Sequence, residues 1–324
     1  METYVIGVDI GGTTTKFGIV NAQGEIVSRG EIRTQKHEDE TPKTTEEFID
    51  ELHGELLKII NQVGGIKAIR GIGIGAPNAN FNKGTIENAA NLWWEGIIPL
   101  GKMVADKFGI PEEKVKVTND ANAAAIGEKV YGAAREMNDF IMITLGTGVG
   151  SGIVIDGKVV YGHDGFAGEL GHITSVRENG RLCGCGRCGC LETYASASGV
   201  ARTAREILET SDRESILRNI TGEITSKDVY DAAVQGDEVA KEIFEFTGKV
   251  LGEALADFAT FSSPEAFILF GGLTKSGNLI LEPVVANMEK NLIPHWRGKI
   301  KVLFSELKES DVAVLGASAL VAEV

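Results

Sequence analysis

Two stretches of the chain share one pattern of apolar runs broken by turns of small residues, the first at residues 5–27 and the second at residues 140–160. Each pattern predicts an apolar strand, a glycine-rich turn, a second strand, a tight turn and a third strand. Gly11 of the first stretch aligns with Gly146 of the second. The repeat predicts two related lobes, each presenting a loop of small residues to one shared cleft.

Helical and strand patterns fill the rest of the chain. Thr44 and Glu47 have the spacing of a capping box, and the apolar residues after them recur at helical spacing, which predicts an amphipathic helix. Those apolar residues are Phe48, Leu52, Leu56, Ile59 and Val63. Strands are predicted within 67–77, 114–120 and 266–272, and helices at 121–130, 237–261, 278–291 and 311–323. We expect the last helix to return to the N-terminal lobe, which would otherwise have few helices.

The composition fits two globular lobes. The chain has 324 residues, of which 43% are hydrophobic and 24% charged, so it holds enough apolar material for two cores. No apolar run reaches the roughly 20 residues that span a bilayer, and the first residues lack the pattern of a secretion signal. We therefore expect a cytoplasmic protein that does not enter a membrane.

The charge of the chain argues against nucleic acid as a partner. The net charge is −14, and no block of lysine and arginine is dense enough to neutralise a duplex backbone. An acidic protein can still bind ATP, because backbone N–H groups hold phosphates and a metal ion neutralises their charge.

The two glycine-rich turns are candidate phosphate-binding loops. Glycine lets the backbone approach a phosphate, threonine hydroxyls add donors, and Asp9 would orient a metal-bound water beside the β- and γ-phosphates. A tight hairpin with Asp9 as a turn former would have the same local sequence. Neither loop is a P-loop, since no Gly-Lys-Ser/Thr follows. The candidate residues are Asp9, Gly11, Gly12, Thr13, Thr14, Lys16, Thr144, Gly146, Thr147 and Gly148.

Asn119 and Asp120 lie where a predicted strand meets a predicted helix. A capping pair is one interpretation, because N-cap residues occur at such junctions. A catalytic pair is the other, because α/β proteins bind ligands at the carboxyl ends of strands. In that role Asp120 would accept the proton of an attacking hydroxyl, and Asn119 would hold a neighbouring hydroxyl.

All four cysteines fall between residues 183 and 190, downstream of His172. A tetrahedral structural zinc site takes four ligands, so His172, Cys183, Cys185, Cys188 and Cys190 compete for four places. Bound zinc would fix the flanking Glu169 and Glu192 relative to each other as two carboxylates that grip sugar hydroxyls. Solvated surface acids are the alternative for both glutamates.

Two further segments carry weaker signals. Asn91 precedes the pair Trp93 and Trp94, and polar amides next to aromatic rings suit a sugar, although core packing explains tryptophans equally well. Gly75 lies near the end of the strand predicted within 67–77, ahead of this segment in the sequence. Residues 271–273, which are Gly271, Gly272 and Leu273, would let a nucleotide lie across a strand-to-helix turn.

Taken together, these segments resemble the ROK family of bacterial sugar kinases and sugar-responsive repressors, and within it the glucokinases, over nearly the whole chain. Residues 9–16 look like the family's first phosphate motif, residues 145–152 its second and residues 271–273 its adenosine motif. The family's sugar-binding pattern matches Asn119, Asp120, Glu169, His172 and Glu192.

The family's zinc pattern, a histidine followed by C-x-C-G-x-x-G-C-x-E, is the most specific match. It implies His172, Cys183, Cys185 and Cys190 as ligands and leaves Cys188 at a variable position. His172 would then bind zinc through one ring nitrogen and sugar through the other. The chain departs from the family at Asn78 and Phe270, where small residues are common.

The resemblance implies an α/β, two-lobed, actin-like ATPase (ribonuclease H-like) fold with duplicated βββαβαβα-type domains and an interlobe cleft. We place the smaller lobe at residues 1–118 plus about 305–324 and the larger, zinc-containing lobe at 119–304. The implied activity is transfer of the γ-phosphate of ATP, with Mg²⁺, to the 6-hydroxyl of a hexose, with Asp120 as general base and Gly75 and Asn91 on the sugar side.

Several alternatives remain open at this point. Glucose leads as substrate, while kinases for N-acetylmannosamine, N-acetylglucosamine, allose and fructose share these motifs. A repressor that binds sugar as inducer would need a helix-turn-helix before the first strand, where the sequence from Tyr4 leaves no room. A sugar-binding module without catalysis is the third possibility. The family also implies a homodimer.

Overall fold

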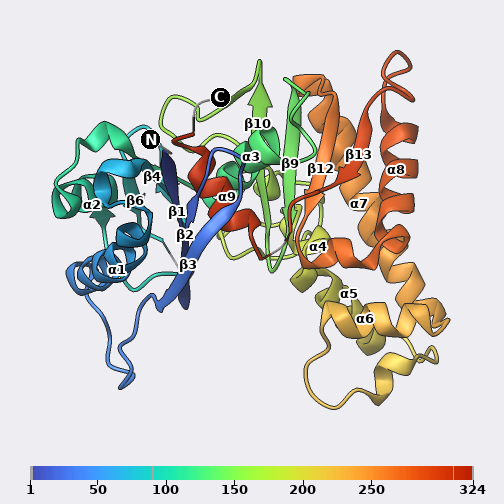
Figure 1. Ribbon diagram of the computed structural model, residues 1–324. Helices are drawn as coiled ribbons and strands as arrows, with labels where there is room; N and C mark the ends of the chain where they lie inside the picture. The colour runs from blue at the N-terminus through green and yellow to red at the C-terminus, as the bar shows by residue number, and fades with distance from the viewer. Residues whose placement is uncertain (1–2, 90, 309, 323–324) are drawn as a thin grey trace. The chain divides into compact units, whose positions relative to one another are not determined.

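The computed structural model describes residues 3–89, 91–308 and 310–322, and packing divides the chain into two compact units (Figure 1). The first unit comprises the chain up to Met137, the segment Lys158–Ala167 and the chain from Glu306 onward. The second comprises Asn138–Gly157 and Gly168–Ser305. The first unit is thus completed by residues from three separate parts of the sequence.

The sheet of the first unit has the strand order β3-β2-β1-β4-β8. Its strands are β1 (Tyr4–Ile10), β2 (Thr14–Val20), β3 (Ile26–Arg33), β4 (Ile69–Gly75) and β8 (Val115–Thr118). β1, β2 and β3 are antiparallel neighbours, and β4 and β8 run parallel to β1. Because Asp9 pairs with Gly75, and Gly75 with Thr118, the carboxyl ends of β1, β4 and β8 meet at one edge of the sheet.

Four helices and a small sheet complete the first unit. The helices are α1 (Thr45–Ile60), α2 (Leu100–Phe108), α3 (Asp120–Tyr131) and α9 (Val312–Ala319), and the small sheet consists of β5 (Ala79–Asn80), β6 (Thr85–Glu87) and β7 (Ile97–Ile98). α1 contacts α2, and α9 contacts β1, β4 and α3. Short 3-10 turns occur at Asn61–Val63, Ile66–Ala68 and Glu112–Lys114.

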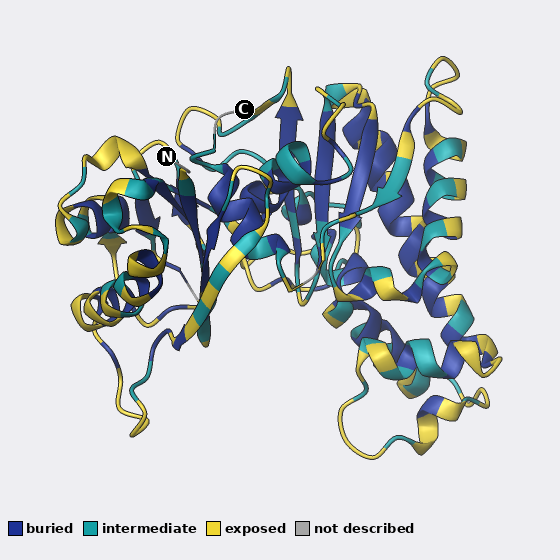
Figure 2. Ribbon diagram, viewed as in Figure 1, coloured by how far each residue is buried: buried dark blue, intermediate teal, exposed yellow. Residues whose placement is uncertain are grey.

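Alternation along β1 assigns its side chains to two faces of the sheet. Ile6, Val8 and Ile10 belong to the large core that α1 and α2 cover, while Val5 packs with Val314 of α9. Figure 2 shows β1 and β4 of this sheet largely buried, whereas β3 at its edge is half-buried to exposed and α1 has exposed residues along its outer side. Residues 5, 7 and 9 share the face toward α9, so alternation places the Asp9 carboxylate on that face.

In the second unit, four strands form a sheet in the order β10-β9-β12-β13. They are β9 (Phe140–Leu145), β10 (Val149–Ile155), β12 (Ala266–Phe270) and β13 (Lys301–Phe304), whereas β11 (Lys158–Val159) begins the segment that belongs to the first unit. The helices are α4 (Glu192–Ala195), α5 (Ala197–Thr210), α6 (Ser226–Val234), α7 (Glu238–Ser262) and α8 (Asn278–Asn291), with 3-10 turns at Leu170–His172, Ile216–Asn219 and Gly272–Ser276. α7 packs on α8 (Figure 1), and Gly248 and Gly252 let the two helices approach closely.

The hydrophobic pattern predicted these elements well. The duplicated stretches form the antiparallel series β1-β2-β3 and the antiparallel pair β9-β10, which β11 follows in the sequence. The capping box at Thr44 and Glu47 is present with both hydrogen bonds. Val63 lies outside α1, contrary to the prediction, because the helix ends at Ile60 and the chain then turns through Gly64 and Gly65 with positive φ. α9 returns to the first unit, as expected, and residue 323 of the predicted helix lies outside the described residues.

α3 belongs to the first unit, whereas the sequence boundary after residue 118 put it with the second. The reason is packing: an added Cβ on Gly127 of α3 would lie 2.9 Å from Cα of Gly316 in α9. The segment Lys158–Ala167 also joins the first unit, where Tyr161 stacks on Phe81 with 3.9 Å between ring centroids.

In the described part of the chain, no helix combines the length and the apolar character needed to cross a membrane.

We expect Gly7→Ala to destabilise the first unit by about 3 kcal/mol or more, because the added Cβ would overlap the carbonyl oxygen of Val314. Urea unfolding measures the effect. The matched control is Gly54→Ala, a change in the middle of α1 with no atom within 4 Å of the added Cβ, which should stabilise the protein by about 0.5–1 kcal/mol. A Gly7→Ala protein as stable as the wild type would contradict this account of how α9 packs.

Candidate active site and metal centre

Two carboxylates meet at the edge of the first sheet where β1, β4 and β8 end. Asp9 is next to last in β1, and Asp120 is the first residue of α3, directly after β8. Gly75, the last residue of β4, lies between them, since a Cβ placed on it would be 3.9 Å from Oδ1 of Asp9 and 4.0 Å from Cα of Asp120. The structure thus brings together three of the predicted site residues.

The environment of Asp9 favours its protonated form. Burial, and secondly the charge of Asp120, raise the pKa of Asp9 to about 6, while Lys16, its cross-strand partner, acts in the opposite direction. The Asp120 side chain reaches solvent, but the protein around it displaces enough water to raise its pKa as well. Two carboxylates held this close are a site where a cation or a proton is bound readily.

Asn119 is the N-cap of α3, as the capping interpretation of this pair predicted. Its Oδ1 accepts a hydrogen bond of 2.7 Å from the backbone N–H of Asn122. Oδ1 of Asp120 accepts a hydrogen bond of 2.9 Å from the backbone N–H of Ala121. Capping therefore uses Asn119 and leaves part of Asp120 available for chemistry.

The first glycine loop is the turn between β1 and β2, and no helix follows it. Gly11 donates its N–H to the carbonyl of Thr14 at 3.1 Å, and Thr34 donates to the carbonyl of Thr13 at 2.9 Å. Asn91 is exposed and next to this loop, since a Cβ on Gly12 would lie 2.9 Å from its carbonyl oxygen. A residue predicted for sugar binding thus adjoins a loop predicted for phosphate binding.

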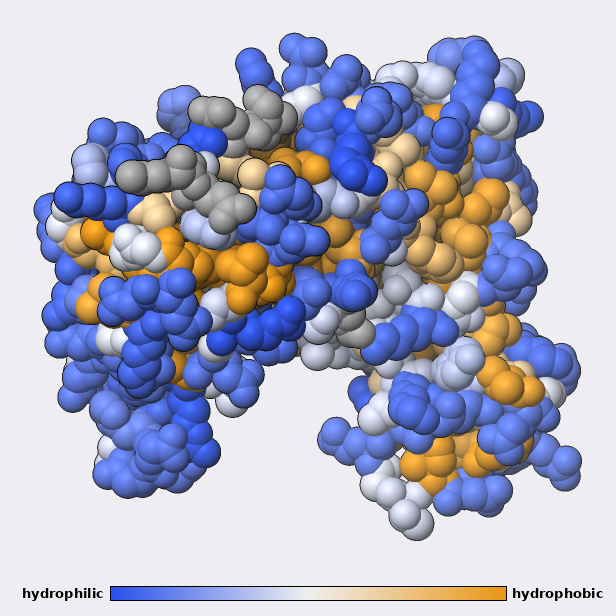
Figure 3. Space-filling view, in the orientation of Figure 1, coloured by the Kyte–Doolittle hydropathy of each residue, from blue (hydrophilic) through white to orange (hydrophobic). Residues whose placement is uncertain are grey.

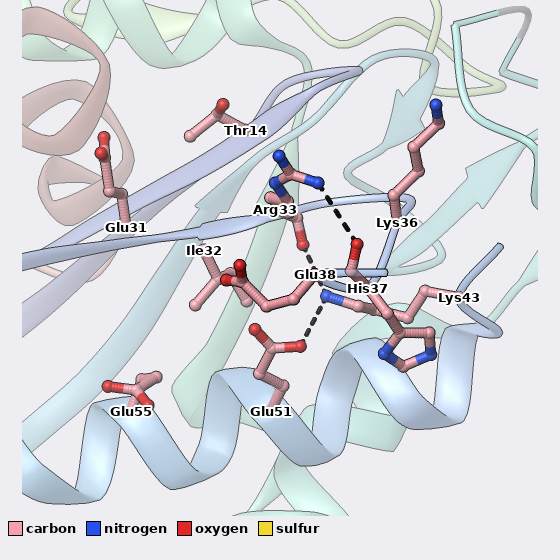
Figure 4. Close-up of a pocket in the computed structure, with 10 residues that line it drawn as sticks. All are labelled: Thr14, Glu31, Ile32, Arg33, Lys36, His37, Glu38, Lys43, Glu51 and Glu55. Carbon is pink, nitrogen blue, oxygen red and sulfur yellow. Dashed lines mark hydrogen bonds and ion pairs between the residues drawn. The ribbon is translucent and has the colours of Figure 1, made fainter. Parts of the chain in front are cut away.

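Pockets flank the connection between β3 and α1. One, of about 460 Å³, includes Gly12, Thr13 and Thr14 of the glycine loop in its lining. The other, of about 660 Å³, is lined mainly by charged side chains (Figure 4). Residues 36–41 between them form a hydrophilic projection (Figure 3). In the second unit, Thr147 and Glu192 line a pocket of about 200 Å³ together with Ser196, Arg202 and Arg205.

The conformation of Asn78 explains why asparagine can stand at this position, where the family commonly has a small residue. Its φ is 50°, a backbone conformation that glycine and asparagine adopt more easily than other residues. Its side-chain amide donates to the carbonyls of Glu87 at 3.3 Å and Asn88 at 3.2 Å. Asparagine therefore keeps the turn that a glycine would allow and adds two hydrogen bonds across it.

The second glycine loop connects β9 to β10 in the second unit. Gly146 donates to the carbonyl of Gly148 at 3.0 Å, and the hydroxyl of Thr144 accepts from the N–H of Gly150 at 3.1 Å. Oε2 of Glu192 accepts from the N–H of Val149 at 3.1 Å and lies where a Cβ on Gly148 would be. Glu192 is half-buried against this loop, so it is not the solvated surface acid of the alternative interpretation.

The turn at Gly271 lies beside the second loop. Phe270 pairs with Thr144 across β12 and β9, and a Cβ on Gly271 would lie 2.6 Å from the carbonyl oxygen of Leu145. Gly271 has φ of 112°, which glycine alone adopts without strain. Leu273 is buried, so its side chain contributes packing beneath the turn.

Four potential metal ligands converge in the second unit. The ligand atoms of His172, Cys183, Cys185 and Cys190 all lie within 4.8 Å of one another. Cys183 Sγ is 3.7 Å from Nδ1 of His172, and the sulfurs of Cys185 and Cys190 are 3.6 Å apart. Tetrahedral zinc with Zn–S bonds of about 2.3 Å places sulfur ligands about 3.8 Å apart, so these residues fit zinc.

Cys188 is exposed and is not among the four. The spacing of the cysteines alone left five candidates for four places, and the structure selects the set that the family pattern implied. Burial raises the pKa of Cys183 to about 12 and also raises that of Cys190, while a hydrogen bond from the N–H of Arg187 lowers that of Cys185. A divalent cation would favour all three thiolates.

The metal cluster contacts the residues predicted to grip the sugar. Oε1 of Glu192 lies 3.6 Å from Cys183 Sγ, and the carbonyl of Glu169 accepts from the N–H of His172 at 3.0 Å. The Glu169 side chain is exposed. The roles assigned to these residues in binding sugar and ATP stay predictions.

Gln35 was not singled out from the sequence. Its side-chain amide contacts both Gly12 of the first glycine loop and the segment from Asn91 to Trp93. The sequence does not reveal these contacts, because all three partners of Gln35 are backbone groups, which are present in every residue type.

Comparison with known proteins identifies the family of the chain. The family model described as "ROK family" matches residues 5–324. A glucokinase from Halalkalibacterium halodurans is 37% identical over 99% of this chain and 95% of its own, and a xylose repressor from Caldicellulosiruptor bescii is 32% identical over 98% of this chain and 77% of its own.

Among solved structures, a ROK family glucokinase from Streptomyces griseus, in complex with glucose and AMPPNP, is 35% identical, covers 98% of both chains and superposes with a TM-score of 0.76. The α/β, actin-like ATPase fold expected from the sequence is thereby confirmed. This chain belongs to the ROK family.

Proposed function

We propose that this protein is an ATP-dependent hexose kinase that transfers the γ-phosphate of ATP to the 6-hydroxyl of glucose. The observation that carries the proposal is the meeting of Asp9 and Asp120 on either side of Gly75, next to a glycine loop, at the edge where three strands end. The similarity to glucokinases, one of them solved with glucose and a nucleotide, supports glucose as substrate.

Asp120 acts as the general base. Its free carboxylate oxygen takes the proton of the 6-hydroxyl as the oxygen attacks the γ-phosphorus in line, and ADP leaves. Asn91 and Asn119 hold sugar hydroxyls beside it. The family pattern assigns further sugar contacts to Glu169, His172 and Glu192. Positioning and charge neutralisation provide most of the rate enhancement, with the base contributing about 10²–10⁴-fold.

Asp9 and the glycine loops bind the nucleotide. Mg²⁺ bound with ATP would neutralise the β- and γ-phosphates, and Asp9 would orient it through its water ligands. Backbone N–H groups of the two glycine loops donate to phosphate oxygens, and the turn at Gly271 and Gly272 provides room for adenosine. Zinc would be held by His172, Cys183, Cys185 and Cys190 and would have a structural role, since four protein ligands leave no open position.

A coupled ADP-release assay tests the proposed activity. We expect ADP formation with glucose to exceed that with N-acetylmannosamine, N-acetylglucosamine, allose and fructose. Asp120→Asn should keep the fold and sugar binding while turnover falls by about 10²–10⁴-fold, because the amide cannot accept the proton.

The matched control is Asp106→Asn on the exposed side of α2, where the carboxylate pairs with Lys102 at 2.7 Å, and it should keep wild-type turnover. Wild-type turnover in Asp120→Asn would exclude Asp120 as the base. Absence of turnover with every hexose in the wild type would favour a sugar-binding regulator instead.

The raised pKa of Asp9 predicts a stability cost in the ligand-free protein. The pKa is 3.8 for an unperturbed aspartate and about 6 here, so the folded state binds this proton more tightly than the unfolded state. The reduction in the free energy of unfolding has its full value above pH 6, where Asp9 is ionised in both states, and it disappears as the pH falls from 6 towards 4. Asp9→Asn should therefore raise the free energy of unfolding at pH 7.5 by about 2 kcal/mol, and by progressively less at lower pH.

Urea unfolding between pH 4.5 and 8 measures this difference, with Asp257→Asn on the exposed side of α7 as the matched control. A difference between Asp9→Asn and the wild type that does not change with pH would contradict the burial of an ionised Asp9. We also expect Asp9→Asn to lose activity, because it weakens the metal–nucleotide complex.

Two cysteine variants test the metal site. Cys185→Ser removes one of the four ligands and should lose zinc, whereas Cys188→Ser changes an exposed thiol outside the cluster and should keep about one equivalent per chain. Elemental analysis gives the zinc content, and calorimetry gives the affinity for glucose. Glucose affinity should fall only in Cys185→Ser, because Glu192 contacts the cluster. Absence of zinc from the native protein would refute the structural role.

The family resemblance further implies a homodimer, which light scattering of the purified protein would detect.

A further inference from the structure

The geometry points to Gln35 as a positioning residue that couples the sugar-binding loop to the phosphate-binding loop of the first unit. This inference rests on the proposed function, because it takes Gly12 as part of the phosphate site and Asn91 as part of the sugar site. It adds a residue that touches neither ligand and acts through the backbone of both loops.

One side chain satisfies three backbone groups. Nε2 of Gln35 donates to the carbonyl of Gly12 and, at 3.0 Å, to the carbonyl of Asn91, while Oε1 accepts from the N–H of Trp93. A primary amide has two donor hydrogens on nitrogen and an acceptor oxygen, so only this orientation satisfies all three partners. The side chain is buried, with 8% of its surface exposed, so water replaces these bonds poorly if they are lost.

The backbone of Gln35 is fixed on both sides. Thr34 donates its N–H to Thr13 of the glycine loop at 2.9 Å, and its buried hydroxyl is 2.9 Å from that of Thr15. The carbonyl of Gln35 accepts from the N–H of Lys43 at 2.8 Å.

Lys43 is anchored in turn. Its buried ammonium donates to the carbonyl of Arg33 at 2.8 Å and pairs with Glu51 of α1 at 2.5 Å (Figure 4). The Gln35 amide therefore projects from a rigid base, so a displacement at one of its partners is passed to the other.

The segment that Gln35 holds carries one exposed and one buried tryptophan. Trp94 is buried and packs against Phe48 of α1, with 4.8 Å between the ring centroids and the rings tilted by 50°. Trp93 is 54% exposed, and the ammonium of Lys36 lies 5.8 Å from the centroid of its ring. Leu92 is also buried. The two bonds from Gln35 span Asn91 to Trp93, so they fix the backbone from which the Asn91 side chain reaches the sugar.

The arrangement links the two binding events energetically. A sugar that orders Asn91 also orders the Gln35 amide, and this amide orients the carbonyl of Gly12 and with it the N–H groups of the phosphate loop. The first ligand to bind then loses the conformational entropy of ordering both loops, and the second ligand does not lose it again. Binding of the two ligands is therefore cooperative. Reciprocity requires the nucleotide to raise the affinity for glucose by the same factor.

Calorimetric titration of the zinc-containing protein with glucose, with and without saturating Mg²⁺-AMPPNP, measures this coupling. We expect the wild type to bind glucose about fivefold or more tightly when the nucleotide is present. Gln35→Met keeps the length of the side chain and removes all three hydrogen bonds, so the ratio of the two dissociation constants should fall to within about twofold of unity. A loss of overall stability would not change this ratio.

Gln23→Met is the matched control and should keep the wild-type ratio. Gln23 is exposed in the turn between β2 and β3, and among the described residues its side chain has no hydrogen-bond partner. If thermal unfolding shows that Gln35→Met does not fold, Gln35→Asn serves instead, because it retains the amide but is one methylene too short to reach its partners.

A wild-type ratio in the folded Gln35 variant, or no coupling in the wild type, would overturn the inference. Both results are distinct from failure of the proposed function, which would appear as absence of hexose phosphorylation by the wild type.

Discussion

Close contact between α9 and the glycines of the first sheet is the constraint on which the site depends. Gly7 of β1 and Gly73 of β4 are paired neighbours, and each leaves room for a carbonyl of α9 where any Cβ would overlap it. Gly127 of α3 and Gly316 of α9 make a similar approach. β1 carries Asp9 and α3 begins with Asp120, so backbone contacts through one helix determine how far apart these carboxylates lie.

Much of this arrangement could be predicted from the sequence, because it has a local signature. The duplicated strand pattern predicted the first three strands of both sheets, and the spacing of Thr44 and Glu47 predicted the start of α1. The cysteine cluster indicated a metal site, although only the family pattern and the folded geometry separate Cys188 from the four residues that converge. Asn119 was ambiguous between a cap and a sugar ligand, and the structure assigns its Oδ1 to the cap.

Contacts between distant segments could not be predicted in this way. Gln35 bonds to backbone groups at positions 12, 91 and 93, and backbone groups are the same for every residue type. The placement of α3 in the first unit depends on the pair Gly127 and Gly316, and every residue of the second unit lies between them in the sequence. In both cases the sequence contains the residues but no spacing that reveals their partners.

The glycine contacts of α9 also have a consequence for biosynthesis. Residues 312–319, which form α9, leave the ribosome after every strand of the first sheet, against which they pack. At about 5–20 residues per second, synthesis of the roughly 240 residues between Gly73 and α9 takes about 12–48 seconds. During that interval the face of β1 and β4 that carries Gly7 and Gly73 is not yet covered by α9. The first unit therefore begins to be synthesised before the second and is completed after it.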